Sequence, residues 1–273
     1  MKKSHWGYYL VTIIFLIITL FPFFWILITS FKPSADIFGD NAFRVFTHSM
    51  TLENYKSILI GKNIPSSIKN SLLISLITTM YVVVISTLAA YAISRFHFRF
   101  KNFLMGLILV IAMFPQMIIV GPIFNLFTSL HWTNTYAIVL PYSTITIPAA
   151  VWLMVAHFKK IPISIEESAK IDGATPFQTL SKIVMPIAAP GVFTTAIMTF
   201  IAAWNEYLLS ATLNTEIPMQ TVPVAISFLR TQFQIMWGEV CAATVIVTIP
   251  TLIIVLVFQK QIVSGLVSGA VKE

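Results

Sequence analysis

The residues of this chain that could do chemistry are few, and their spacing offers no catalytic arrangement. ATP hydrolysis would need a phosphate-binding GxxxxGK[ST] loop. The only Gly-Lys pair, Gly61-Lys62, is followed by Asn63 and lacks the upstream glycine. The five histidines stand apart from one another, without the spacing of metal ligands: His5, His48, His97, His131 and His157. We therefore expect no catalytic residue, bound metal or cofactor in this chain.

The polar residues that do cluster lie between residues 163 and 191, in the stretch ISIEESAKIDGATPFQTLSKIVMPIAAPG. Ser164 and Glu167 have the spacing of a capping box, in which each side chain bonds the backbone N–H of the other residue. This predicts a short helix that begins at about Ile165. Gly173 follows Asp172 where a residue of positive φ would end that helix.

A second short helix is predicted directly after the glycine. Thr175 can cap it, Pro176 suits its first position, and Gln178 completes a second capping box. Pro186 is expected to end it. An apolar stripe on this helix needs a partner surface: Phe177, Leu180 and Val184. Isolated helices shorter than about 12 residues are marginal in water, so another surface must hold both helices.

Three sequence patterns resemble one family of membrane proteins. EESAKIDGA followed by IVMPIAAPG resembles the cytoplasmic EAA loop of the permease subunits of binding-protein-dependent ABC importers. IDGATPFQ, FIAAWNEYLL and the ending FQKQIVSGLVSGAVKE resemble the second permease subunit of carbohydrate importers of the maltose and trehalose group. Ser168 stands where the family has alanine, and Met185 where leucine is common. Both changes keep the size or the apolar character of the residue.

The resemblance implies that the loop docks into a groove of a separate ATPase subunit. The coupling residues it implies are Ser164, Glu166, Glu167, Ala169, Asp172, Gly173, Ala174, Phe177 and Pro186. The alternative is an amphipathic hairpin on the lipid surface. Such helices carry several basic residues on the polar face. The first predicted helix has two acidic residues, Glu166 and Glu167, and only one basic residue, Lys170, and an anionic leaflet does not favour this balance of charge.

Polar and aromatic residues inside the apolar segments could line a path for a sugar, which needs hydroxyl partners and flat aromatic faces. The candidates are Gln116, Asn125, Tyr142, Thr146, Trp204, Asn205 and Glu206. Tyr142 and Thr146 are four residues apart and share one helical face. The alternative is that these residues join helices through hydrogen bonds within the bundle.

Composition places the whole chain in a membrane. Of its 273 residues, 57% are hydrophobic and 10% charged, far less charge than in soluble proteins. The net charge of +7 comes from basic residues scattered at segment ends rather than gathered on one face, so nucleic acid is not an expected partner. The single cysteine, Cys241, excludes an internal disulfide framework.

Charge-free intervals long enough to cross about 30 Å of hydrocarbon define the expected helices. We expect an all-α integral membrane protein with six spans, at about 8–31, 70–94, 103–127, 136–158, 191–212 and 240–262. The resemblance implies the type I ABC importer permease fold. We divide the chain into three parts. Residues 1–68 form a first span with an outer loop, and residues 69–262 form a five-helix core that holds the coupling loop at about 159–190. Residues 263–273 form a cytoplasmic tail.

Lysine and arginine are concentrated in the loops that share a side with the N-terminus, which predicts cytoplasmic termini and a cytoplasmic coupling loop. The predicted function is a permease subunit of an ATP-driven importer for a carbohydrate, such as trehalose or maltose, in the cell membrane. The implied partners are a second permease, a pair of ATPase subunits that bind ATP and Mg, an extracytoplasmic sugar-binding protein and the lipid bilayer. The alternatives are an importer for a glycerol phosphodiester or polyol, an ion-coupled carrier, or a scaffold without transport.

Overall fold

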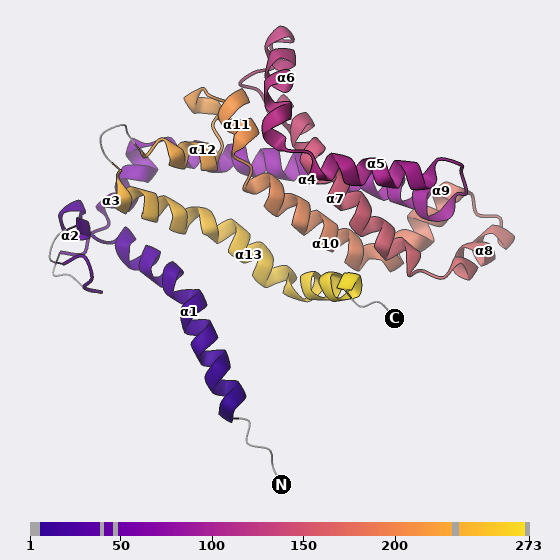
Figure 1. The fold of residues 1–273 in the computed structure, drawn as a ribbon, viewed down its shortest axis with the longest axis horizontal. Helices are drawn as coiled ribbons and strands as arrows, with labels where there is room; N and C mark the ends of the chain where they lie inside the picture. Colours follow the sequence, from indigo (N-terminus) through magenta and orange to yellow (C-terminus); the bar gives the residue numbers. More distant parts are fainter. Residues whose placement is uncertain (1–5, 39–40, 46–48, 231–234, 271–273) are drawn as a thin grey trace. The chain divides into compact units, whose positions relative to one another are not determined.

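The computed structural model describes residues 6–38, 41–45, 49–230 and 235–270, with no side-chain description beyond residue 261. The described residues are mostly helical (Figure 1). The chain divides into two compact units, residues 1–66 with 224–250 and residues 67–223 with 251–273. Each unit is described by itself.

The first unit contains the N-terminal span and the connection that follows it. Its helices are α1 (Trp6–Ser30), α2 (Ser34–Phe38), α3 (Glu53–Lys56), the π-helical turn η1 (Ser57–Gly61) and the first part of α13 (Trp237–Ala270). The Asn54 amide joins α3 to the end of α1, because it donates hydrogen bonds of 2.9 Å to the carbonyls of Ser30 and Lys32. The Ser57 hydroxyl donates to Glu239 of α13 at 2.7 Å.

Apart from the first three residues of α4, which belong to the first unit, the second unit holds the rest of α13 and the other helices. They are α4 (Ile64–Arg95), α5 (Lys101–Met113), α6 (Gln116–Ser129), η2 (Tyr136–Ile138), α7 (Val139–Lys159), α8 (Ile163–Ile171), α9 (Pro176–Gln178), η3 (Thr179–Val184), α10 (Met185–Trp204), α11 (Leu208–Leu213) and η4 (Ile217–Met219). The short helix α12 (Val222–Ser227) lies at the boundary between the units.

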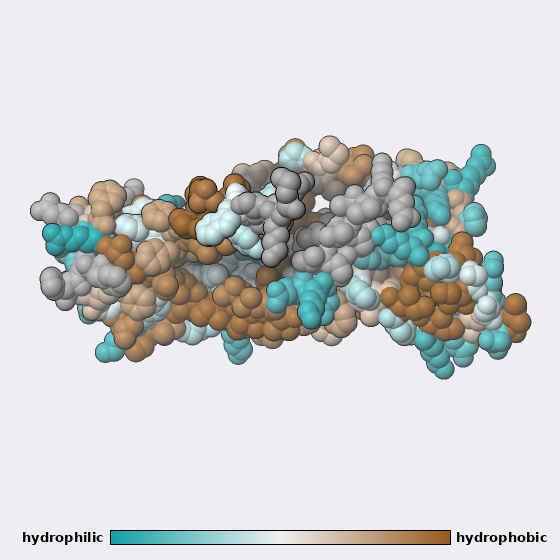
Figure 2. All heavy atoms as spheres, turned by 90° about the horizontal axis from the view of Figure 1, so that it is seen from below, coloured by the Kyte–Doolittle hydropathy of each residue, from teal (hydrophilic) through white to brown (hydrophobic). Residues whose placement is uncertain are grey.

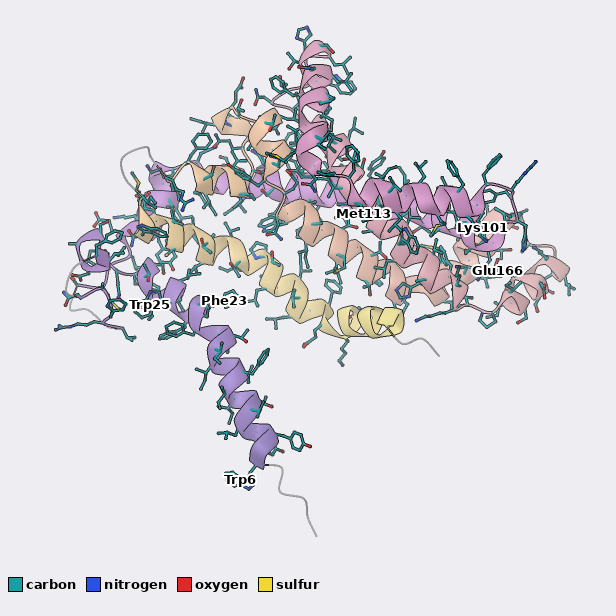
Figure 3. The ribbon with its side chains drawn as sticks, in the orientation of Figure 1. Trp6, Phe23, Trp25, Lys101, Met113 and Glu166 are labelled. Atoms are coloured by element: carbon teal, nitrogen blue, oxygen red, sulfur yellow. The ribbon has the colours of Figure 1, made fainter. Side chains whose placement is uncertain are left out.

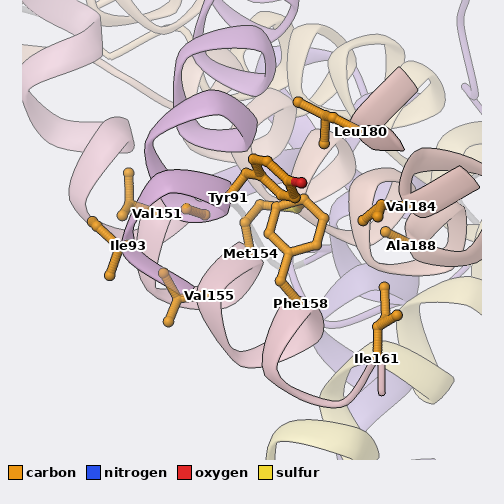
Figure 4. Close-up of a cluster of buried hydrophobic side chains, with 11 residues drawn as sticks. Tyr91, Ile93, Val151, Met154, Val155, Phe158, Ile161, Leu180, Val184 and Ala188 are labelled. Carbon is orange, nitrogen blue, oxygen red and sulfur yellow. The ribbon is translucent and has the colours of Figure 1, made fainter. Parts of the chain in front are cut away.

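Helices α7 and α10 pack side by side in the second unit, and α4 packs with them around an apolar cluster. Figure 4 shows the ring of Phe158 at the centre of this cluster beside Tyr91 and Met154. Leu180 and Val184, from η3, close its other side. The cluster therefore joins two spans to the segment that follows the polar loop.

Five helices in the described part of the chain are long and apolar enough to cross a membrane, or six if α5 and α6 count as one bent span. The sequence predicts the span at 103–127 as one helix kinked by Pro115 and Pro122, but the structure has two helices, which meet at an angle of 91° across Phe114 and Pro115. Phe114 has extended backbone angles, with ψ at 130°, as a residue before proline prefers. Figure 3 shows α5 running from Lys101 to Met113 before the turn.

The expected continuous span at 191–212 is also interrupted. Helix α10 ends at Trp204, and α11 begins at Leu208 after a three-residue break. The Glu206 carboxylate accepts hydrogen bonds from the backbone N–H groups of Leu209 (2.7 Å) and Ser210 (3.1 Å). These amides open a new helix, and a side-chain acceptor there favours a fresh helix start over continuation.

Candidate functional site

The polar loop contains the two predicted short helices, but the first begins differently from the expectation. Helix α8 runs over Ile163–Ile171 with Pro162 at its N-cap and no side-chain cap. The predicted capping box of Ser164 with Glu167 is therefore wrong. The helix begins two residues earlier than expected, directly after Pro162 with its fixed φ, and Ser164 therefore lies inside the first turn. The Ser164 carbonyl accepts from the Ser168 hydroxyl at 3.0 Å.

Gly173 ends α8 as predicted, with a φ of +80°. Its N–H donates to the Lys170 carbonyl at 3.1 Å, and the Ala174 N–H donates to the Ala169 carbonyl at 2.9 Å. This pair of bonds is the Schellman arrangement that satisfies the last carbonyls of a helix. A side chain with a Cβ would be strained at this φ.

The second capping box is present as predicted. The Thr175 hydroxyl accepts from the Gln178 N–H at 3.3 Å, and the Gln178 side chain accepts from the Thr175 N–H at 2.9 Å. The prediction that Pro186 ends this helix is wrong, since α9, η3 and α10 run on to Trp204. Pro186 is the second residue of α10 and directly follows the π-helical turn η3, where the regular α-helical bonding is already altered.

Side chains on the loop divide into a buried set and an exposed set. Glu166 and Ala169 are buried, whereas Ser164, Glu167, Asp172 and Gly173 are exposed and Ala174 is half-buried. Large apolar side chains lie on the exposed surface, with Ile171 86% and Phe177 72% exposed. The predicted stripe is therefore only partly correct, because Leu180 and Val184 join the apolar cluster while Phe177 points away from it. Figure 2 shows hydrophilic and apolar side chains intermingled at this end of the unit.

A buried ion pair that the sequence did not reveal holds α8 against α4. Arg95, the last residue of α4, donates through Nε to one Glu166 carboxylate oxygen. Tyr91, one turn earlier, donates its hydroxyl to the other oxygen at 3.0 Å. Glu166, in the first turn of α8, is labelled in Figure 3. The available signals were an acidic residue in the loop and an arginine at a span end. Arg95 and Glu166 are 71 positions apart in the sequence, and no local pattern pairs residues at that separation.

The candidate path residues mostly serve the bundle itself. Glu206 is buried and caps α11. The Thr146 hydroxyl donates to the Tyr142 carbonyl at 3.0 Å, which confirms their shared face. Buried Tyr142 packs in an apolar cluster with Ala203 and Leu209. The Asn205 amide is exposed and donates to the Ile201 carbonyl at 2.8 Å.

The other three path candidates lie in different surroundings. The buried Trp204 ring stacks on Phe200, with ring centroids 5.8 Å apart. Gln116 lines a cavity of about 610 Å³ at the bend between α5 and α6, and this cavity is otherwise mostly apolar. Asn125 is exposed on α6. Tyr142 and Glu206 therefore lie near the break after α10, whereas Gln116 belongs to a separate cavity.

Known proteins resemble this chain over almost its whole length. The trehalose/maltose transport system permease protein MalG of Thermococcus litoralis is 40% identical over 264 residues, covering 95% of this chain and 94% of that protein. The trehalose transport system permease protein SugB of Mycobacterium tuberculosis is 40% identical over 93% of this chain and 92% of its own length. The sulfoquinovosyl glycerol transport system permease protein SmoH of Agrobacterium fabrum is 35% identical over 95% of this chain and 91% of its own.

The fold has a solved counterpart as well. A chain of a bacterial ABC transporter involved in the import of the acidic polysaccharide alginate superposes with a TM-score of 0.79 at 21% identity, over 95% of this chain and 98% of that one. Residues 82–267 match the model of the binding-protein-dependent transport system inner membrane component. With that match and these relatives, the chain belongs to the family of binding-protein-dependent transport system inner membrane components.

Proposed function

We propose that this chain is one of two homologous permease subunits of an ABC importer that takes up a carbohydrate, with an α-linked disaccharide such as trehalose or maltose as its cargo. The observation that supports this most strongly is the 40% identity, over more than nine-tenths of the chain, to two permease proteins named for trehalose or for trehalose and maltose. The chain forms half of the translocation path. Two ATPase subunits bind ATP and Mg, and an extracytoplasmic binding protein delivers the sugar.

The exposed surface of α8 and α9 is the proposed docking site for the ATPase. Ile171 and Phe177 expose large apolar side chains beside the charged Glu167 and Asp172. Such a mixed surface on two short helices suits burial in a groove of another protein. A membrane surface fits less well, because α8 carries one lysine, Lys170, against two glutamates.

The proposed mechanism uses the loop as a lever. Closure of the ATPase dimer on ATP moves the docked loop, and the spans follow as rigid bodies that switch the cavity between inward and outward access. This mechanism requires residues 159–190 and both termini to lie in the cytoplasm. The excess of lysine and arginine on that side supports the orientation.

Ligand-stimulated ATP hydrolysis tests the proposal. The complete assembly, purified from its native membrane through a tag on this chain, is placed in lipid nanodiscs and tested with its binding protein and a panel of saccharides. We expect an ATPase to co-purify in stoichiometric amount and an α-linked disaccharide to stimulate it most. Stimulation by a glycerol phosphodiester or a polyol instead would assign the alternative cargo expected from the sequence. Stimulation by a glycerol glycoside would assign a different cargo, of the kind for which the 35% identical sulfoquinovosyl glycerol permease is named. Absence of any co-purified ATPase would contradict the proposal.

A further inference from the structure

We infer that Arg95, Tyr91 and Glu166 form a clamp that fixes α8 to the end of α4, and that Arg95 and Glu166 are positioning residues through which movement of the docked loop is passed to the spans. The inference rests on the proposed function, since it concerns how the coupling loop acts on the rest of the chain. The relevant observation is a hydrogen-bonded ion pair between two elements that are distant in sequence.

Three hydrogen bonds converge on the clamp from three elements. The Glu166 carboxylate of α8 accepts from Arg95 Nε on one oxygen and from the Tyr91 hydroxyl on the other. The same guanidinium donates through Nη2 to the carbonyl of Ile161, in the link between α7 and α8, at 3.0 Å. One arginine at the end of α4 therefore fixes both the link that precedes α8 and the first turn of α8.

The clamp is buried although it lies in a polar loop. The side chains of Arg95 and Glu166 are 8% and 6% exposed, and Tyr91 packs edge to face on Phe158 in the apolar cluster below. Buried charges hold their geometry closely, because separating them leaves an unpaired charge away from water. The planar guanidinium also fixes direction in a way that a lysine ammonium does not.

The two adjacent glutamates of α8 differ in burial. Glu166 is buried in the clamp, whereas Glu167 is exposed on the proposed docking surface. Within the described residues, the side-chain hydrogen bonds that join α8 to a span all pass through Glu166. The remaining support is apolar, from Ile165 and Ala169. Apolar packing resists separation but allows sliding, so the clamp is the element that fixes the direction of α8.

A paired substitution separates this role from simple stability. Replacing both charges with apolar residues, in Arg95→Met with Glu166→Leu, leaves no unpaired buried charge and is often tolerated. We expect this double variant to reach the membrane, to capture the ATPase and to hydrolyse ATP. We expect sugar uptake per ATP hydrolysed to fall about 10-fold, within the range of known coupling between sites. Arg95→Lys, which keeps the charge without the planar fork, should give an intermediate ratio.

Arg99→Met is the matched control, since Arg99 is an exposed arginine four residues further along the chain, and it should leave the ratio unchanged. A double variant with the wild-type ratio of uptake to hydrolysis would overturn the clamp and leave the proposed function intact. If the double variant fails to accumulate, the ratio for Arg95→Lys decides, and a wild-type value there would equally overturn the clamp. A wild-type assembly with neither captured ATPase nor uptake would instead contradict the proposed function.

Discussion

Replacing Gly173 by alanine should weaken the docking of the ATPase through the backbone alone. A Cβ built at Gly173 meets nothing within 4 Å, so the substitution causes no collision. The cost comes from the φ of +80°, since the left-handed conformation costs an L-residue about 1–2 kcal/mol. That energy corresponds to a factor of about 5–30 in the population of the turn.

The expected loss follows from this population. The apparent dissociation constant equals the intrinsic constant divided by the competent fraction of the loop, so Gly173→Ala should raise it by up to about 5–30-fold. Gly173→Asn should have a smaller effect, because asparagine visits this conformation. Gly173→Val should have a larger one, and it should uncouple ATP hydrolysis from uptake while leaving the protein in the membrane.

Titration of purified permease in nanodiscs with its ATPase subunit measures these constants. Gly106→Ala is the control, because it makes the same change in the helical part of α5, also with open space around the Cβ. The order Gly106→Ala, Gly173→Asn, Gly173→Ala, Gly173→Val in increasing dissociation constant is expected. An unchanged constant for all Gly173 variants would refute the reasoning that the docked loop needs this turn.

Further outcomes concern packing, capping and the candidate path. A Cβ at Gly191 would overlap the His157 ring, with its Nδ1 2.8 Å away. Gly191→Ala should therefore destabilise the protein by about 1–3 kcal/mol. The apparent Tm of this variant should fall, and it should largely recover when His157→Ala is added. Thr175→Ala should destabilise the start of α9 by about 1 kcal/mol, which should appear as faster hydrogen exchange at the Gln178 amide. Unchanged exchange would show that the capping box does not stabilise this helix. Glu206→Ala leaves the buried backbone N–H groups of Leu209 and Ser210 without an acceptor, which should cost about 1–3 kcal/mol of stability each. We therefore expect a lower Tm with little effect on the apparent affinity for sugar. A large loss of affinity at constant Tm would show instead that Glu206 binds the substrate.

Two features of the loop could be predicted from neighbouring residues in the sequence. The glycine turn at Gly173 and the box of Thr175 with Gln178 depend on residues within four positions of each other, and both are present. The spans were also predictable, because long apolar intervals have few alternatives to a membrane helix. Their approximate positions agree with α1, α4, α7 and the first part of α13.

Predictions failed where two local preferences compete. Ser164 could cap α8, but the helix already begins at Ile163 after Pro162, so Ser164 lies inside the first turn. Pro186 could end a helix, yet the preceding π-helical turn lets the helix continue. The apolar interval 103–127 is long enough for one span, whereas the extended Phe114 before Pro115 breaks it into two helices. Spacing alone does not rank such preferences.

The clamp could not be predicted because it depends on tertiary contact. Arg95 and Glu166 meet only when α4 and α7 pack together and bring α8 to the end of α4. The candidate path residues show the same limit, since Glu206 has the residue type of a substrate ligand but caps α11 in the structure. The roles of the coupling and path residues stay predictions.

Cysteine crosslinking at the loop tests the central claim most directly. Ile171→Cys and Phe177→Cys, in a background with Cys241→Ala, place reactive thiols on the exposed surface of α8 and α9. In intact cells these thiols should resist membrane-impermeant reagents, and in the purified assembly they should crosslink to the ATPase subunit. Labelling from outside the cell, or the absence of any crosslink to an ATPase that co-purifies, would contradict the proposed coupling loop.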